Sequence, residues 1–187
     1  MDQKKLEQAA RLIIEAVGED PKREGLLETP RRFAEMVAEQ LAYAAVPNEE
    51  IARAFDKTFS SPESDMVVVK DISLFSHCEH HIALMYNMKA AVGYIPRGRV
   101  IGLSKIARIA DAVSKRLQIQ ERIGADIRDI MERITGAGDV IVLLEGEHSC
   151  MTARGIRKPG TLTRTISASG RFRTCLLYTS PSPRDRT

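Results

Sequence analysis

A chain of 187 residues is long enough to bury the core of one domain and short for two. Its 43% hydrophobic and 28% charged residues are typical of a soluble globular protein, and no apolar run approaches membrane-spanning length, so we expect no membrane partner. The net charge of +3 falls in residues 171–187, which carry four arginines and one aspartate, so no nucleic-acid partner is expected.

The use of cysteine and the N-terminal residues indicate the compartment. The three cysteines are an odd number and do not suggest a disulfide framework. The first residues run into an amphipathic pattern that contains Arg11 and Glu15, which is unlike a signal peptide. We therefore expect a cytoplasmic protein.

The first 62 residues predict an N-terminal helical region. Apolar residues recur at helical spacing over residues 4–17, and Gly18 is expected to end that helix. Thr29 is expected to cap a second helix, with Pro30 at its first position. A short helix and a loop are expected before Pro62.

Residues 63–173 predict a catalytic region that belongs with the first residues to one domain overall. We expect strands at residues 66–69, 140–144 and 161–167, and a hairpin between residues 81 and 96 that turns at Tyr86 and Asn87. Ser104 is expected to cap a helix to about Leu117, and another helix covers about residues 120–134 before Gly136. This order of helix pairs and strand pairs is typical of an α+β fold with an antiparallel sheet.

The last stretch, residues 174–187, has neither a helical nor a strand period. It ends in a Ser/Pro-rich run of the kind found in unstructured chain. We expect it to be a non-native or disordered tail.

Histidine and cysteine are concentrated in two short segments. All four histidines, and both cysteines that precede the tail, lie in His77–His81 and His148–Cys150. Imidazole and thiolate are preferred ligands of zinc, and three protein ligands leave an open position for water, as in catalytic sites. Taken alone, Cys78 and His81 could equally be a buried cysteine near a surface histidine. The second segment favours a metal site, because alternation along a strand would place residues 148 and 150 on one face.

Cationic side chains near these segments suit a phosphate-bearing substrate. Lys105 and Arg108 are three residues apart after Ser104, so they share one face of a helix whose N-terminus attracts anions. Arg154, Arg157 and Lys158 follow Cys150. The alternative is that all of them are solvated surface charges.

Two carboxylates have simpler explanations beside their functional ones. Glu121, at the start of a helix, could complement the helix dipole or accept the N–H groups of a purine edge. Glu79 could be an exposed charge or the partner of a histidine that binds metal.

The chain resembles GTP cyclohydrolase I in several motifs, in order, from about residue 15 to residue 172. The motifs are Glu19–Pro30, Cys78–His81, Tyr94–Pro96, Val100–Arg108, Gln118–Arg122 and His148–Gly155. The resemblance implies hydrolytic opening of the imidazole ring of GTP, release of formate and rearrangement to 7,8-dihydroneopterin triphosphate. That reaction is the first step toward folate or biopterin.

The resemblance also assigns roles by motif position. Zn²⁺ would be held by Cys78, His81 and Cys150, and its bound water would attack C8 of the purine. His148 would protonate the ring nitrogen, and His80 would assist proton transfer. Glu121, helped by Gln120, would bind the guanine edge. Ribose and triphosphate would be bound by Ser104, Lys105, Arg108 and Arg154.

The fold implied by the resemblance is a T-fold, an antiparallel sheet with paired helices on one face that closes into a barrel only by oligomerisation. A homodecamer of stacked pentamers with shared active sites is expected. Arg32 matches a triphosphate contact from a neighbouring subunit. Glu35 stands where some members carry lysine, which predicts that this contact is weaker or not general.

Two other functions remain as alternatives at this point. One is another T-fold enzyme acting on a purine or a pterin, which the presence of both His/Cys segments disfavours. The other is a non-catalytic zinc-binding assembly protein, which the filled catalytic positions disfavour. His77 has no role that the sequence assigns.

Overall fold

The computed structural model describes residues 1–63 and 65–174, which form two compact units. The first unit is residues 1–44 and the second begins at Ala45. This grouping does not test the expected division of function at residue 62, which stays a prediction. Apart from Thr174, the expected tail lies outside the described residues. No helix in the described part of the chain is long and apolar enough to cross a membrane.

The first unit consists of helix α1 (Gln3–Ala16), a short 3-10 turn (Glu24–Leu26) and helix α2 (Thr29–Gln40). Asp2 caps α1 by accepting a hydrogen bond from the amide of Lys5 at 3.1 Å. Helix α2 starts one residue earlier than expected: Glu28 is at the N-cap and makes no side-chain cap bond. The predicted cap at Thr29 is therefore wrong, although Pro30 does lie in the first turn.

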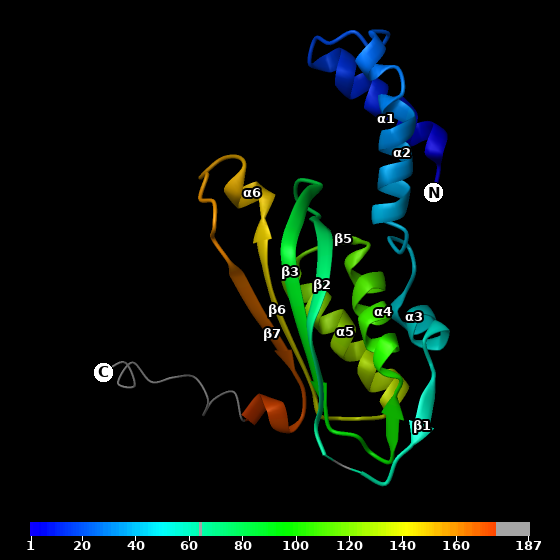
Figure 1. Cartoon of the computed structure of the whole chain (residues 1–187), viewed down its shortest axis with the longest axis vertical. Coiled ribbons are helices and arrows are strands. Elements are labelled where there is room, and N and C mark those ends of the chain that lie inside the picture. The colour runs from blue at the N-terminus through cyan, green and yellow to red at the C-terminus, as the bar shows by residue number, and fades with distance from the viewer. Residues whose placement is uncertain (64, 175–187) are drawn as a thin grey trace, which may run out of the picture. The chain divides into compact units, whose positions relative to one another are not determined.

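The second unit is built on a five-stranded sheet with the strand order β5-β2-β3-β6-β7 (Figure 1). Neighbouring strands run antiparallel, except that the two-residue strand β5 lies parallel to the end of β2. A separate pair joins β1 (Thr58–Ser60) and β4 (Arg99–Ile101). The strands of the large sheet are β2 (Val67–Cys78), β3 (Ala83–Tyr94), β5 (Leu117–Gln118), β6 (Val140–His148) and β7 (Thr163–Ala168).

The expected hairpin between residues 81 and 96 is wrong. Residues 83–94 form one continuous strand, and the hairpin turn lies before it, at residues 79–82 between β2 and β3. Asn87 has a φ of +51°, and the register with β6 shifts between Tyr86 and Lys89. A bulge inside a strand therefore produced the turn signal in the sequence.

Helices α4 (Leu103–Ser114) and α5 (Gln120–Thr135) pack against each other and against the sheet. Their apolar stripes are fully buried, at Ile106, Ile109 and Val113 in α4 and at Ile123, Ile127, Ile130 and Met131 in α5. A shorter helix, α3 (Asn48–Ala54), contacts both. The expected α+β fold with paired helices is confirmed.

The ends of the two long helices agree only in part with expectation. Gly136 ends α5 with a φ of +66°, as predicted. Ser104, by contrast, is inside α4, whose N-cap is Gly102 and which has no side-chain cap. Helix α4 also stops at Ser114, because the expected end, Leu117, belongs to β5.

Helix α4 has a fixed direction along the sheet. Just before it, the amide of Ile101 donates to the hydroxyl of Tyr94 at 3.2 Å, and Tyr94 pairs with Val67 at the start of β2. At its other end, the hydroxyl of Ser76 donates to the carbonyl of Ser114 at 2.7 Å. The first turn of α4 thus lies beside the start of β2, and its last turn lies near the end of that strand (Figure 1).

Candidate metal centre

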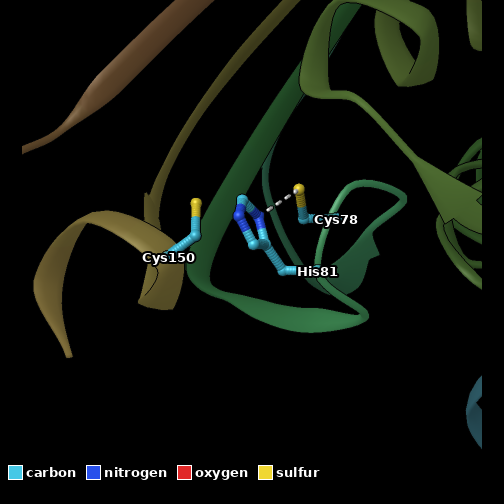
Figure 2. A group of neighbouring side chains, drawn as sticks. All are labelled: Cys78, His81 and Cys150. Atoms are coloured by element: carbon cyan, nitrogen blue, oxygen red, sulfur yellow. Dashed lines mark hydrogen bonds between the residues drawn. The ribbon is translucent and has the colours of Figure 1, made fainter. Parts of the chain in front are cut away.

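The two His/Cys segments meet because β3 lies between the strands that carry them. Cys78 is the last residue of β2, His81 lies in the turn that follows, and Cys150 lies in the short helix α6 (Ser149–Thr152) directly after β6. The three ligand atoms all lie within 4.8 Å of one another. Figure 2 shows the imidazole of His81 between the two thiols.

The local geometry differs from the expected strand alternation. Strand β6 ends at His148, and helix α6 begins at the next residue, so residues 148 and 150 do not alternate along one strand. Strand β2 ends at Cys78 and His80 lies in the turn that follows, with its Nδ1 3.7 Å from the Sγ of Cys78. The turn after β2 and the short helix after β6, rather than strand alternation, bring the donors together.

The donor set fits a zinc ion. In a tetrahedral site, sulfur lies about 2.3 Å and imidazole nitrogen about 2.0 Å from zinc, which separates two such ligands by about 3.5 Å. The Sγ of Cys78 and the Nδ1 of His81 are 3.9 Å apart. Burial and the neighbouring Cys78 raise the pKa of the Cys150 thiol, so a bound cation would have to displace its proton.

Hydrogen bonds hold helix α6 against β3. The hydroxyl of Tyr86 lies 2.9 Å from the hydroxyl of Thr152 and donates to Glu147 at 3.3 Å. The hydroxyl of Ser149 donates to the carbonyl of Leu84 at 2.7 Å. The thiol of Cys150 is therefore carried by a short helix that is tied down on both sides of it. Sequence reasoning did not find Tyr86 in this role, because nothing in the sequence shows which strand lies beside α6.

The turn that carries His80 and His81 is linked to α5. Arg122 donates to both carboxylate oxygens of Glu79, at 2.6 and 3.2 Å, and holds the pKa of that carboxyl below its usual value. His80 is exposed, with its Nε2 4.0 Å from Glu79. The Nη1 of Arg154 donates to the Nε2 of His81 at 2.7 Å. Arg122 was missed from the sequence, where it has the same appearance as other surface arginines.

His148 lies at the end of β6 beside the start of α5. Its Nε2 is 2.9 Å from the Oε1 of Gln120, which is only 1% exposed. Burial lowers the pKa of His148, while the charge of the nearby Glu121 opposes that shift. The structure therefore brings His148, Gln120 and Glu121 to one place.

His77 is 9% exposed and packs edge-on against Phe75. Its Nδ1 is buried without a hydrogen-bond partner in the described part of the chain, and burial lowers its pKa. It is a packing residue next to the cluster.

The expected phosphate contacts on α4 are far from the cluster within one chain. Ser104, Lys105 and Arg108 lie in the first two turns of α4, beside the start of β2, whereas Cys78 ends that strand. Helix α4 rises about 1.5 Å per residue, so Lys105 lies roughly 14 Å along the helix from Ser114, whose carbonyl is bound by Ser76 near the end of β2. Ser104 and Arg108 are exposed, and the Nζ of Lys105 lies 5.9 Å from the ring centre of Phe55. These three side chains therefore lie apart from the cluster of Cys78, His81 and Cys150 in the same chain.

Arg32 belongs to the first unit and is exposed on α2. Glu35 is bound by Arg31 at 2.6 Å, and Arg31 also binds Glu28 at 2.8 Å. The carboxylate at position 35 is therefore paired within its own helix rather than with Arg32.

Known proteins match nearly the whole chain in sequence. The profile of the family described as GTP cyclohydrolase I matches residues 6–176. The GTP cyclohydrolase 1 of Clostridium acetobutylicum is 56% identical over 178 residues, which cover 92% of this chain and 91% of that protein. The GTP cyclohydrolase 1 of Clostridium botulinum strain Kyoto is 55% identical over 180 residues, with 93% and 92% covered.

Among solved structures, the apo form of the archaeosine synthase QueF-Like is 18% identical, with 59% of this chain and 96% of that chain covered and a TM-score of 0.45. The assignment rests on the sequence relatives and not on this likeness. A family match from residue 6 to residue 176, together with relatives more than half identical, confirms the resemblance seen in the motifs. The chain belongs to the GTP cyclohydrolase I family.

Proposed function

We propose that this protein is a zinc-dependent enzyme that opens the imidazole ring of GTP, releases formate and forms 7,8-dihydroneopterin triphosphate. The observation that carries the proposal is the convergence of Cys78, His81 and Cys150 in a chain of this family. The enzyme would act in the cytoplasm, at the first step of folate or pterin synthesis.

The proposed site uses a zinc ion and two histidines. Cys78, His81 and Cys150 would hold the zinc ion, which would supply a water of lowered pKa as the nucleophile. His148 delivers a proton to the ring nitrogen of the purine, and the exposed His80 assists proton transfer during ring opening. The Nδ1 of His80 lies 3.7 Å from the Sγ of Cys78, and His148 is two residues before Cys150, which supports their action on the same purine.

The guanine is held by Glu121, the buried Gln120 contributes through its hydrogen bond to His148, and Arg154 binds the phosphate side of the substrate. Glu121 is exposed in the first turn of α5 and close enough to His148 to affect its pKa. The side chain of Arg154 reaches His81.

The remaining contacts come from a neighbouring subunit. Ser104, Lys105 and Arg108 lie in the first turns of α4, away from the cluster of their own chain, which favours a second chain that presents its α4 to this cluster. Arg32 is proposed to act in the same way. A homodecamer of stacked pentamers, in which the sheets join into a barrel, would place these groups together.

Purified protein incubated with GTP tests the proposal. We expect a pterin triphosphate product, followed by its absorbance and fluorescence, and one formate per turnover. Chelation should abolish the reaction and added zinc should restore it. Cys150→Ala should lower activity at least about a thousandfold, because a catalytic metal contributes several kcal/mol. Absence of product from an assembled, zinc-loaded protein would reject the proposal.

A further inference from the structure

The side chain of Gln120 is buried at the junction of α5, β6 and β7. Its Nε2 donates to the carbonyls of Leu144 and Thr163, at 3.2 and 3.0 Å, and lies 3.3 Å from the hydroxyl of Thr165. Its Oε1 lies 2.9 Å from the Nε2 of His148. One amide thus contacts two strands and the proposed proton donor at once.

These contacts fix which way the amide faces. Main-chain carbonyl oxygens accept hydrogen bonds and cannot donate them. If the amide of Gln120 were turned over, its oxygen would face the carbonyl oxygens of Leu144 and Thr163 without a hydrogen between them. In a residue that is 1% exposed, water cannot relieve that loss. The oxygen of Gln120 must therefore face His148.

The orientation of the amide in turn fixes the proton of His148. An amide oxygen only accepts, so the Nε2 of His148 has to be the donor in this hydrogen bond. In the neutral ring the single N–H is then on Nε2, and Nδ1 carries the lone pair. Among the described residues, the hydrogen bonds of His148 use only Nε2, which leaves Nδ1 free to meet a ligand.

We propose that Gln120 is a positioning residue that keeps the proton of neutral His148 on Nε2, so that Nδ1 is the atom that passes a proton to the purine. When the imidazolium acts, the Nδ1–H bond breaks and its electron pair stays on the ring as the proton forms a bond to a ring nitrogen of the substrate. The ring returns to the Nε2–H form that Gln120 holds. The proton-transfer part of this inference rests on the proposed function, whereas the position of the ring proton does not.

Nitrogen NMR of zinc-loaded protein labelled with ¹⁵N-histidine tests the position of the ring proton without substrate. The chain has four histidines, and a His148→Asn variant identifies the signals of His148. At a pH where the ring is neutral, we expect Nε2 to give a protonated signal and Nδ1 an unprotonated one. A wild-type spectrum with the proton on Nδ1 would overturn the proposal directly.

Two variants separate the effect of Gln120 on the ring proton of His148 from its hydrogen bonds to β6 and β7. Gln120→Met removes every hydrogen bond of the amide, whereas Gln120→Glu loses the amide donors to β6 and β7 but keeps an acceptor facing His148. We expect Gln120→Met to give a mixture of ring tautomers and Gln120→Glu to keep the proton on Nε2. Gln118→Met is the matched control, because Gln118 is equally buried but donates to Val113 and Asp126 and, among the described residues, forms no side-chain hydrogen bond with a histidine. It should leave the His148 signals unchanged.

Steady-state kinetics with GTP complete the test. Gln120→Met should lower kcat about 10- to 100-fold with KM largely retained, and Gln120→Glu should recover part of that loss. A raised KM with kcat and the His148 signals unchanged would show that Gln120 is a substrate contact instead. If both Gln120 variants lost the Nε2–H tautomer of His148 equally, an acceptor oxygen at position 120 would not be what keeps the proton on Nε2. A wild type without activity would reject the proposed function, while the spectra would still test the ring proton.

Discussion

The thiol of Cys150 couples metal binding to pH. Burial and the neighbouring Cys78 raise its pKa, so the thiol keeps its proton at neutral pH when no cation is bound. A metal that binds the thiolate must release this proton. We expect the zinc affinity of chelator-stripped protein to rise between pH 6 and pH 8, by about tenfold per pH unit for this proton alone. Competition with a chromogenic chelator at several pH values measures the slope.

The Cys150→Ala variant is the control for that slope. It should bind zinc more weakly, and its affinity should depend on pH less steeply by about one proton. Equal slopes in the wild type and the variant would contradict the assignment of Cys150 as a ligand.

Functional residues could be predicted where the sequence carries a local motif. The residues that they contact in the fold could not. The gathering of Cys78, His81 and Cys150 was expected from motif resemblance, and the structure places them together. The register of α5 against the sheet determines the ion pair of Arg122 with Glu79 and the four hydrogen-bond contacts of Gln120. Such long-range register leaves no periodic trace in a single sequence.

At the level of elements, hydrogen bonds from β3 hold helix α6, which carries the proposed metal ligand Cys150. The hydroxyl of Tyr86 contacts Thr152 and Glu147. Tyr86→Phe removes both contacts and keeps the ring, so α6 should become more mobile relative to Cys78. We expect zinc affinity to fall about tenfold, as for other groups that orient ligands, and the free energy of unfolding to fall by only about 1 kcal/mol.

Zinc titration and urea unfolding of the same samples measure the two effects. Lys89→Met is the control, because Lys89 is on the same strand but donates to Ser73 on β2 and not to α6. It should leave zinc affinity unchanged. If Tyr86→Phe bound zinc as tightly as the wild type, the hydrogen bonds of Tyr86 would not position Cys150.

The elements themselves were predictable to different degrees. Helices α1, α4 and α5 follow the 3.6-residue period of their apolar residues, and their existence was expected. Strand β3 was divided wrongly, because its bulge at Asn87 has the residue and the backbone angle of a turn. Local signals cannot tell a bulge from a turn, because only pairing with β2 and β6 distinguishes them.

At the scale of the whole molecule, the large sheet has two edges without a neighbouring strand among the described residues. Strand β7 is one edge, with Ile166 47% exposed. On the other side, β5 pairs only with His77 and Cys78, so among the described residues the rest of β2 has no strand beyond it. Val68 on β2 is 51% exposed. Two unlike open edges suit head-to-tail pairing between copies, which closes into a ring when the rotation allows.

Sharing of the active site between copies can be tested with two inactive variants. Lys105→Ala damages the first turn of α4, and Cys150→Ala damages the metal cluster at the other end of the sheet. If each site combines α4 of one chain with the cluster of another, mixed oligomers contain some sites with both parts intact. We expect each variant alone to be nearly inactive and co-expressed, doubly tagged oligomers to regain a substantial fraction of wild-type kcat.

The matched control combines Cys78→Ala with Cys150→Ala. Both changes damage the same cluster, since the two thiols lie within 4.8 Å of each other, so no arrangement of subunits restores an intact one. This mixture should stay inactive at every ratio of the two chains. Recovery in the control, or no recovery in the Lys105→Ala and Cys150→Ala mixture despite assembled hetero-oligomers, would show that α4 and the cluster do not form one site across subunits. Because neither variant chain carries both an intact α4 and an intact cluster, recovery in the first mixture alone would require a neighbour to supply α4.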